Sequence, residues 1–220
     1  MRVRRAGDAA VLVETEDQAA AHRLQAAVRA ARIPGVVDVV PGASTVLVLT
    51  EPGRCDLDRL AAALPALPLP ESATAETAPV TIPVDYDGDD LDDVASLTGF
   101  SRDELIARHA AASYTVAYLG FAPGFAYLTG LDPALHLPRL ETPRTAVPAG
   151  SVAIAGPYAA VYPAASPGGW RLLGRTDFTL WDVHRDPPSV LQPGTRVRFS
   201  PRRAQRPPVE PSQPGEGAPR

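Results

Sequence analysis

Between residues 139 and 175 the sequence gathers side chains that could bind a small anion. Four arginines fall in this stretch, and two glycines precede a tryptophan. An arginine guanidinium is a planar fork of donors that suits a carboxylate, carbamate or phosphate, and paired glycines let a ligand approach the backbone closely. The candidate site residues of this stretch are Arg139, Arg144, Ser151, Tyr162, Ser166, Gly168, Gly169, Trp170 and Arg175.

Arg144 is the residue that we most expect to contact the anion. It stands in the segment TPRTAVP, where prolines on both sides stiffen the loop and lower the entropy cost of presenting the guanidinium. Its removal should weaken turnover and leave folding intact. Ser151 and Ser166 have no nucleophile-elbow context, so locally both are interpreted as turn residues.

A second group of candidates lies in the segment LGFAPGFAYLTG, where aromatic residues fall in a turn instead of a strand. The residues concerned are Phe121, Pro123, Gly124, Phe125 and Tyr127. Such a turn either folds back into the core or forms the wall of a site. Composition also permits a plainer interpretation of both segments, in which Pro-Gly turns, a buried tryptophan and surface arginines merely close a barrel.

Composition excludes several classes of protein. All 21 basic residues are arginine, and without lysine the chain has no Walker-type phosphate loop, Schiff-base amine or biotin-carrying lysine. The net charge of −4 argues against a nucleic-acid partner. We expect no signal peptide and no membrane span, and hence a cytoplasmic location.

Histidine and cysteine offer no metal site and no obvious catalyst. The four histidines share no ligand spacing with one another or with Cys55, so no metal is expected. Cys55 is interpreted as structural. His109 follows Leu105 on the same face of a predicted helix, which favours a half-buried core histidine over a catalytic one. The catalytic residues stay unassigned.

Residues 1–76 predict a small α+β domain. A strand at AAVLVE, a helix after a capping box at Thr15 and Gln18, a hairpin at Pro41-Gly42-Ala43 and a helix from Asp56 follow one another. This order indicates a ferredoxin-like sandwich.

Residues 77–202 predict a β-barrel domain. The acidic run after residue 84 does not fit a calcium loop, because Gly88 and Ser96 break its pattern, so its carboxylates are interpreted as stabilising a helix start. Ser101 and Glu104 form a capping box for the next helix. Short apolar runs separated by Gly/Pro turns then indicate a closed or nearly closed barrel. The proline-rich residues 203–220 should be disordered.

Five segments in order resemble a known family: LGFAPGFAYLTGLDP, PRLETPR, VPAGSVAIAG, YPAASPGGWRLLGRT and LQPGTRVRF. The family is that of the 5-oxoprolinase B subunit, also called allophanate hydrolase subunit 1 or Kip-type kinase inhibitor, which corresponds to half of the carboxyltransferase domain of urea carboxylase. The resemblance implies a ferredoxin-like domain followed by a cyclophilin-like barrel. It also implies that the aromatic turn is the wall of a cleft or interface.

The same resemblance implies an activity that needs partners. Together with homologues of the C and A subunits, the chain would open 5-oxoproline to glutamate with ATP as co-substrate, held mostly by a partner. Two alternatives stay open: inhibition of a sensor histidine kinase by direct binding, or a role in a urea carboxylase or allophanate hydrolase.

The sequence departs from the family pattern at one place. After VAIAG the family typically has Gly-Gln-Thr-Gly, whereas this chain has Tyr158 and Ala159 at the amide and hydroxyl positions. If these positions face the ligand, the loss of two polar contacts predicts altered or reduced catalysis.

Overall fold

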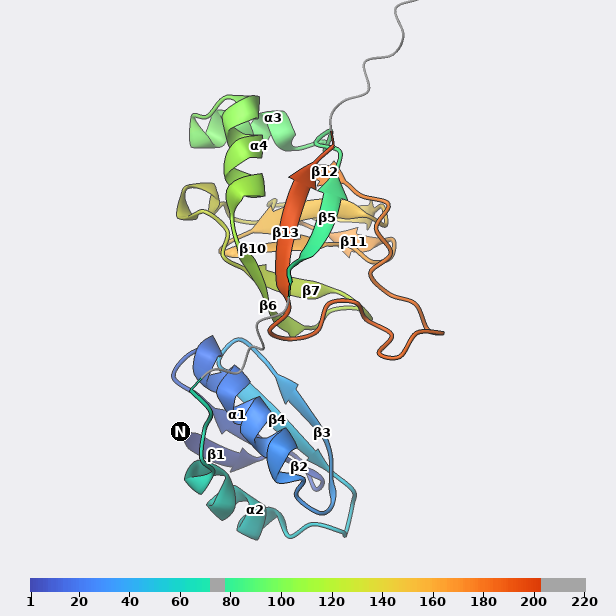
Figure 1. Ribbon diagram of the computed structural model, residues 1–220. Helices are drawn as coiled ribbons and strands as arrows, with labels where there is room; N and C mark the ends of the chain where they lie inside the picture. Colours follow the sequence, from blue (N-terminus) through green and yellow to red (C-terminus); the bar gives the residue numbers. More distant parts are fainter. Residues whose placement is uncertain (72–77, 203–220) are drawn as a thin grey trace, which may run out of the picture.

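The computed structural model describes residues 1–71 and 78–202, which fold around two separate sheets (Figure 1). The smaller sheet uses chain up to residue 50, and the larger one begins at residue 80. The predicted boundary at residue 76 and the predicted tail 203–220 lie outside the described residues.

The first sheet is four-stranded and antiparallel, in the order β1-β2-β4-β3. Alternate residues of its central strands, among them Val11, Val13, Val46 and Val48, are buried on one face, where both helices pack in a single core. The elements are β1 (Arg2–Arg5), β2 (Ala10–Glu14), α1 (Gln18–Ala31), β3 (Val36–Pro41), β4 (Thr45–Thr50), α2 (Leu57–Ala63) and the 3₁₀ turn η1 (Leu64–Ala66).

Two details of this sheet and its helices differ from the sequence prediction. Helix α1 is capped by Asp17, whose carboxylate accepts from the backbone N–H of Ala20 at 2.7 Å, so the predicted capping box at Thr15 is wrong. Strand β1 was not expected, because three of its four residues are arginine and only Val3 packs against the core.

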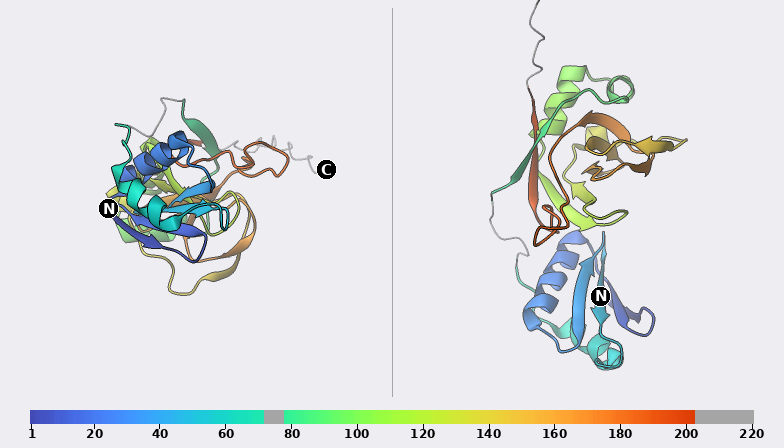
Figure 2. Two further views of the ribbon diagram at one scale, coloured as in Figure 1. Left: turned by 90° about the horizontal axis from the view of Figure 1, so that it is seen from below. Right: turned by 90° about the vertical axis from the view of Figure 1, so that its right-hand side faces the viewer.

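The second sheet has seven strands in the order β12-β9-β10-β7-β6-β13-β5 and curls until its ends meet (Figure 2). A single bridge between Asp85 and Arg175, with backbone bonds of 2.8 and 2.9 Å, joins the two ends. The strands are β5 (Val80–Val84), β6 (Tyr114–Leu119), β7 (Ala126–Thr129), β9 (Ser151–Ala155), β10 (Tyr158–Val161), β12 (Arg171–Arg175) and β13 (Arg196–Pro201).

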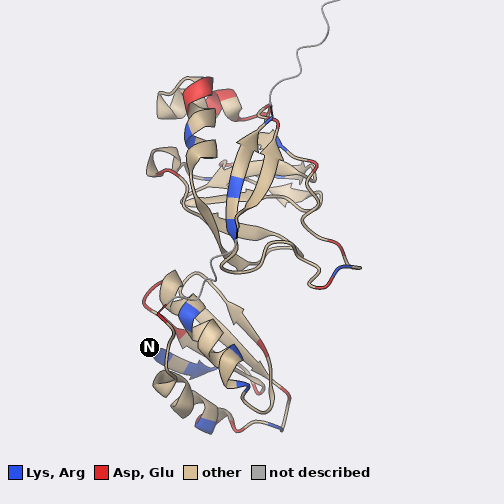
Figure 3. Cartoon of the chain, viewed as in Figure 1, with Lys and Arg blue, Asp and Glu red and all other residues tan. Residues whose placement is uncertain are grey.

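Smaller elements complete the barrel. Helices α3 (Leu91–Thr98) and α4 (Arg102–Ala111) lie over one end of it, and α4 is capped by Ser101 as predicted, with 3.2 Å between its hydroxyl and the N–H of Glu104. Strands β8 (Arg144–Val147) and β11 (Ser166–Gly168) pair as a separate ribbon, and η2 (Pro133–Leu135) is a 3₁₀ turn. Acidic residues gather on α3 and the start of α4 (Figure 3).

The barrel closes only because glycines allow close backbone contact. Gly88 donates to the carbonyl of Leu173 at 3.1 Å, and a β-carbon on Gly88 would collide with the backbone of strand β12. A β-carbon on Gly174 would collide likewise with the carbonyl of Asp85. The seam of the barrel therefore depends on these two residues.

His109 is a core residue, as predicted, but it is completely buried and not half-buried. The hydroxyl of Tyr86 lies 2.7 Å from Nδ1, and the ring stacks on Phe199 with centroids 4.7 Å apart. Burial lowers the pKa of His109 to about 3, so the imidazole is neutral at physiological pH.

Candidate functional site

A hollow of about 90 Å³ opens on the barrel beside the aromatic turn. Nine residues line it, and eight of them are candidates that the sequence singled out. The lining residues are Phe121, Phe125, Tyr127, Arg139, Tyr162, Pro167, Gly168, Gly169 and Trp170. The structure thus brings together two segments that the sequence kept apart.

Phe125 stands at the centre of the aromatic wall. Its ring is buried and meets four others edge to face, at centroid distances of 5.1–5.6 Å, from Phe121, Tyr127, Tyr162 and Trp170. Such edge-to-face contacts hold each ring in one orientation. The aromatic turn therefore does both things that the sequence suggested: it packs into a small core of its own, and it forms the wall of a hollow.

Phe121 is held in a conformation that bulky residues avoid. Its φ is 67°, and the N–H of Ala122 donates to the carbonyl of Gly120 at 2.7 Å, which makes a γ-turn of the strained, positive-φ kind. Despite this strain its side chain is 63% exposed at the rim of the hollow. Strain kept at an exposed aromatic residue is typical of a binding site.

Arg139 supplies the positive charge of the hollow. Its guanidinium carbon lies 5.9 Å from the centroid of the Trp170 ring, in a cation–π contact. Within residues 1–71 and 78–202, Arg139 forms no salt bridge. Since the side chain is exposed and its charge uncompensated, it is free to meet an anion.

Tyr162 forms the part of the wall next to Gly168. Burial raises the pKa of its phenol, which is therefore neutral. A β-carbon on Gly168 would collide with this hydroxyl, so glycine is needed for the ribbon to approach Tyr162.

Arg144, the predicted anion contact, is engaged elsewhere. Its Nη2 lies 2.6 Å from Oδ1 of Asp90, and Oδ2 of the same carboxylate accepts from the N–H of Leu172 at 2.7 Å. The aspartate side chain is only 5% exposed. This arrangement ties the β8–β11 ribbon to strand β12 and gives Arg144 a structural partner. Its contact with an anion stays a prediction.

Asp90 is the residue that sequence reasoning missed. It belongs to the acidic run assigned to a helix start, and that assignment suits Asp92 and Asp93 in the first turn of α3. Asp90 stands at the N-cap position but makes no side-chain capping bond. The sequence offers no local signal that separates Asp90 from its acidic neighbours.

The remaining candidates do not line the hollow. Arg175 pairs with Asp87 at 2.8 Å on the seam, and the hydroxyl of Ser151 donates to the carbonyl of Pro148 at 2.8 Å, as a turn residue would. The Oγ atom of Ser166 is buried and finds no partner among the described residues. Pro123 and Gly124 form the tip of the aromatic turn, where Gly124 packs against Trp181.

The two residues that depart from the family pattern do not face the hollow. Ala159 is fully buried in the barrel core opposite Ile154 and Leu128. Tyr158 packs edge-on against Tyr118 and Tyr127, at 6.0 and 5.6 Å, in a layer behind the wall. A direct polar contact with a ligand in the hollow is therefore not made from either position.

Two features are absent from the described residues. In 1–71 and 78–202 no helix is both long and apolar enough to cross a membrane. The same residues hold no cluster of three or more His, Cys, Asp or Glu side chains placed to bind a metal ion.

The sequence of this chain matches a known protein family. Residues 1–191 match the family model for the carboxyltransferase domain, subdomain C and D. The chain belongs to this family.

Proteins similar to this chain differ in length. A protein of Escherichia coli O157:H7 named as the B subunit of 5-oxoprolinase is 40% identical over 205 residues, which are 90% of this chain and 94% of that protein. The crystal structure of TTHA0988 matches with a TM-score of 0.79 at 38% identity over 94% of this chain, which spans only 42% of that protein.

A more distant structure shows the fold alone. The Kluyveromyces lactis urea carboxylase matches 91% of this chain with a TM-score of 0.69 at 23% identity, and this chain spans 22% of it. The fold of this chain thus recurs as part of a larger enzyme.

Proposed function

We propose that this chain is the B subunit of an ATP-dependent 5-oxoprolinase, a complex that opens 5-oxoproline to glutamate. The observation that carries the proposal is the relative of that name, which aligns along nearly its whole length at 40% identity. We extend the proposal to the hollow, which would form part of the substrate site.

The hollow suits a small cyclic acid. The ring methylenes of 5-oxoproline would pack against aromatic faces, and its carboxylate would meet the exposed guanidinium of Arg139. An unstrained lactam resists water at neutral pH, and transfer of a phosphoryl group to its oxygen would supply a leaving group. Because the chain has no lysine and no phosphate loop, ATP would be held mainly by a partner in the complex.

The finer structural assignments belong to the same proposal. We assign the first domain to the ferredoxin-like class. In that class, the strand that follows the second helix pairs at one edge of the sheet. Here β1 pairs with β2 at that edge instead. The second would be a cyclophilin-like barrel. The partners would be homologues of the C and A subunits, in the cytoplasm.

The test of this function is reconstitution. The purified A and C subunits together with this chain should convert 5-oxoproline to glutamate in the presence of ATP, and activity should rise with added chain until the complex is saturated. Equal glutamate production without this chain would refute the proposal.

Two rival functions make different predictions. A kinase inhibitor would lower the autophosphorylation of a sensor histidine kinase when added at equimolar amounts, without the A and C subunits. A urea carboxylase or allophanate hydrolase component would be encoded beside a biotin carboxylase, whereas a neighbouring gene for an A-subunit homologue favours the proposed function.

A further inference from the structure

One buried hydrogen bond joins the two domains. Nε2 of His22, on helix α1, lies 2.6 Å from the carbonyl oxygen of Ala117 on strand β6. Because a carbonyl can only accept, Nε2 must carry the proton. The first domain lies against the end of the barrel that β6 and β7 form (Figure 2).

The acceptor is available because strand β6 contains a bulge. Val116 pairs with Leu128, but Tyr118 pairs with Tyr127, so Ala117 is the extra residue in the ladder with β7. A buried carbonyl left without a partner is costly, and His22 provides the partner from the other domain.

The bulge lies immediately before the aromatic wall. Tyr118 stacks on Tyr127 with centroids 4.5 Å apart and 21° between the rings. Tyr127 lines the hollow and meets the edges of Phe125 and Trp170. A shift of the bulge would therefore move Tyr118, and through the stacked ring of Tyr127 it would move the wall.

His22 directs its hydrogen bond to the barrel and not to its own sheet. The residue is 8% exposed, and Nε2 bonds to the carbonyl of Ala117. Gln25, one turn further along α1 and 7% exposed, offers the contrast, since it donates to the carbonyl of Val39 in its own sheet at 3.2 Å.

We propose that His22 is a positioning residue for the hollow: by holding the Ala117 bulge, the first domain sets the orientation of Tyr118 and Tyr127. The two domains would then bind substrate as one unit. The identity of that substrate rests on the proposed function, but the coupling between the domains does not.

The first experiment measures amide hydrogen exchange in the isolated full chain. His22→Ala should speed exchange in residues 114–130 about fivefold or more, as expected for the loss of one buried hydrogen bond. His22→Gln, which keeps an N–H donor, should restore part of the protection. Gln25→Ala should leave this segment unchanged. Unaltered exchange in residues 114–130 of His22→Ala would overturn the proposal.

The second experiment uses the reconstituted complex. His22→Ala should raise the KM for 5-oxoproline several-fold with a smaller change in kcat, and His22→Gln should lie between this variant and the wild type. A KM equal to that of Gln25→Ala would count against the coupling. If the wild-type complex has no 5-oxoprolinase activity, the proposed function fails while the exchange result still decides the coupling.

Discussion

Asp90→Ala is expected to lower the free energy of unfolding by about 3–5 kcal/mol, the range typical of breaking a buried ion pair by removing one partner. The change strands the guanidinium of Arg144, one nitrogen of which is already buried without a partner in the described part of the chain. It also removes the acceptor of the Leu172 N–H. Urea unfolding of the full chain, followed by circular dichroism, measures the effect.

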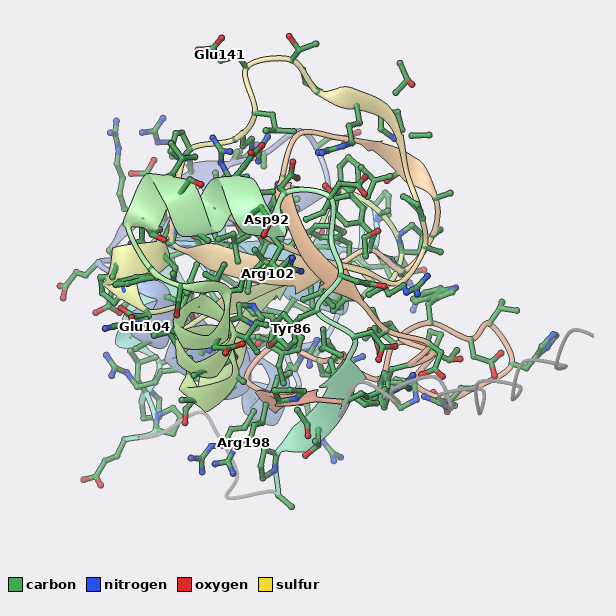
Figure 4. The ribbon with its side chains drawn as sticks, turned by 90° about the horizontal axis from the view of Figure 1, so that it is seen from above. Tyr86, Asp92, Arg102, Glu104, Glu141 and Arg198 are labelled. Carbon is green, nitrogen blue, oxygen red and sulfur yellow. The ribbon has the colours of Figure 1, made fainter. Side chains whose placement is uncertain are left out.

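The matched control is Asp92→Ala, two residues further along. The Asp92 side chain is 73% exposed and pairs with Arg102 at 3.2 Å on the neighbouring helix (Figure 4). A surface pair of this kind contributes only about 0–1 kcal/mol. Asp90→Ala with a stability close to that of Asp92→Ala would show that the buried pair does not hold the ribbon on the barrel.

Arg139→Gln is expected to raise the KM for 5-oxoproline about 10- to 100-fold with little change in kcat, because a hydrogen bond to a charged group contributes about 1.5–3 kcal/mol. An anchor for the carboxylate binds substrate and transition state equally, so its loss appears mainly in KM. Steady-state kinetics of the reconstituted complex measures both constants. Folding should be unaffected, since Arg139 is exposed.

Arg198→Gln is the matched control for this substitution. Arg198 is an exposed arginine of β13, outside the hollow (Figure 4), so its loss removes the same charge without touching the site. Equal KM values for the two variants would show that Arg139 does not bind the substrate.

The sequence predicted the residues of the hollow because their types carry the information. Aromatic residues in a Gly/Pro turn and a Gly-Gly-Trp segment stand out in the sequence, and both segments converge on Phe125. The sequence could not show which arginine is exposed at the hollow and which is held in a buried ion pair. Arg139 and Arg144 stand in similar proline-flanked segments, and their difference comes from Asp90, which lies 54 positions before Arg144.

Long-range contacts explain the other differences as well. The pattern of β1 is dominated by arginine, and only its pairing with β2 makes it a strand. Tyr158 and Ala159 belong to the same strand, yet one packs behind the wall and the other in the barrel core, since neighbouring residues face opposite sides of a sheet. The hydrogen bond between His22 and Ala117 spans 95 positions and leaves no local pattern.

The structure of the reconstituted complex with bound 5-oxoproline tests most directly whether the hollow is part of the substrate site. The expected result is density for the ring in the hollow, against the side of the aromatic wall that Phe121 and Tyr127 form, with the carboxylate within hydrogen-bonding distance of the Arg139 guanidinium. Density for 5-oxoproline at a site that includes no residue of this chain, with the hollow empty, would contradict the account.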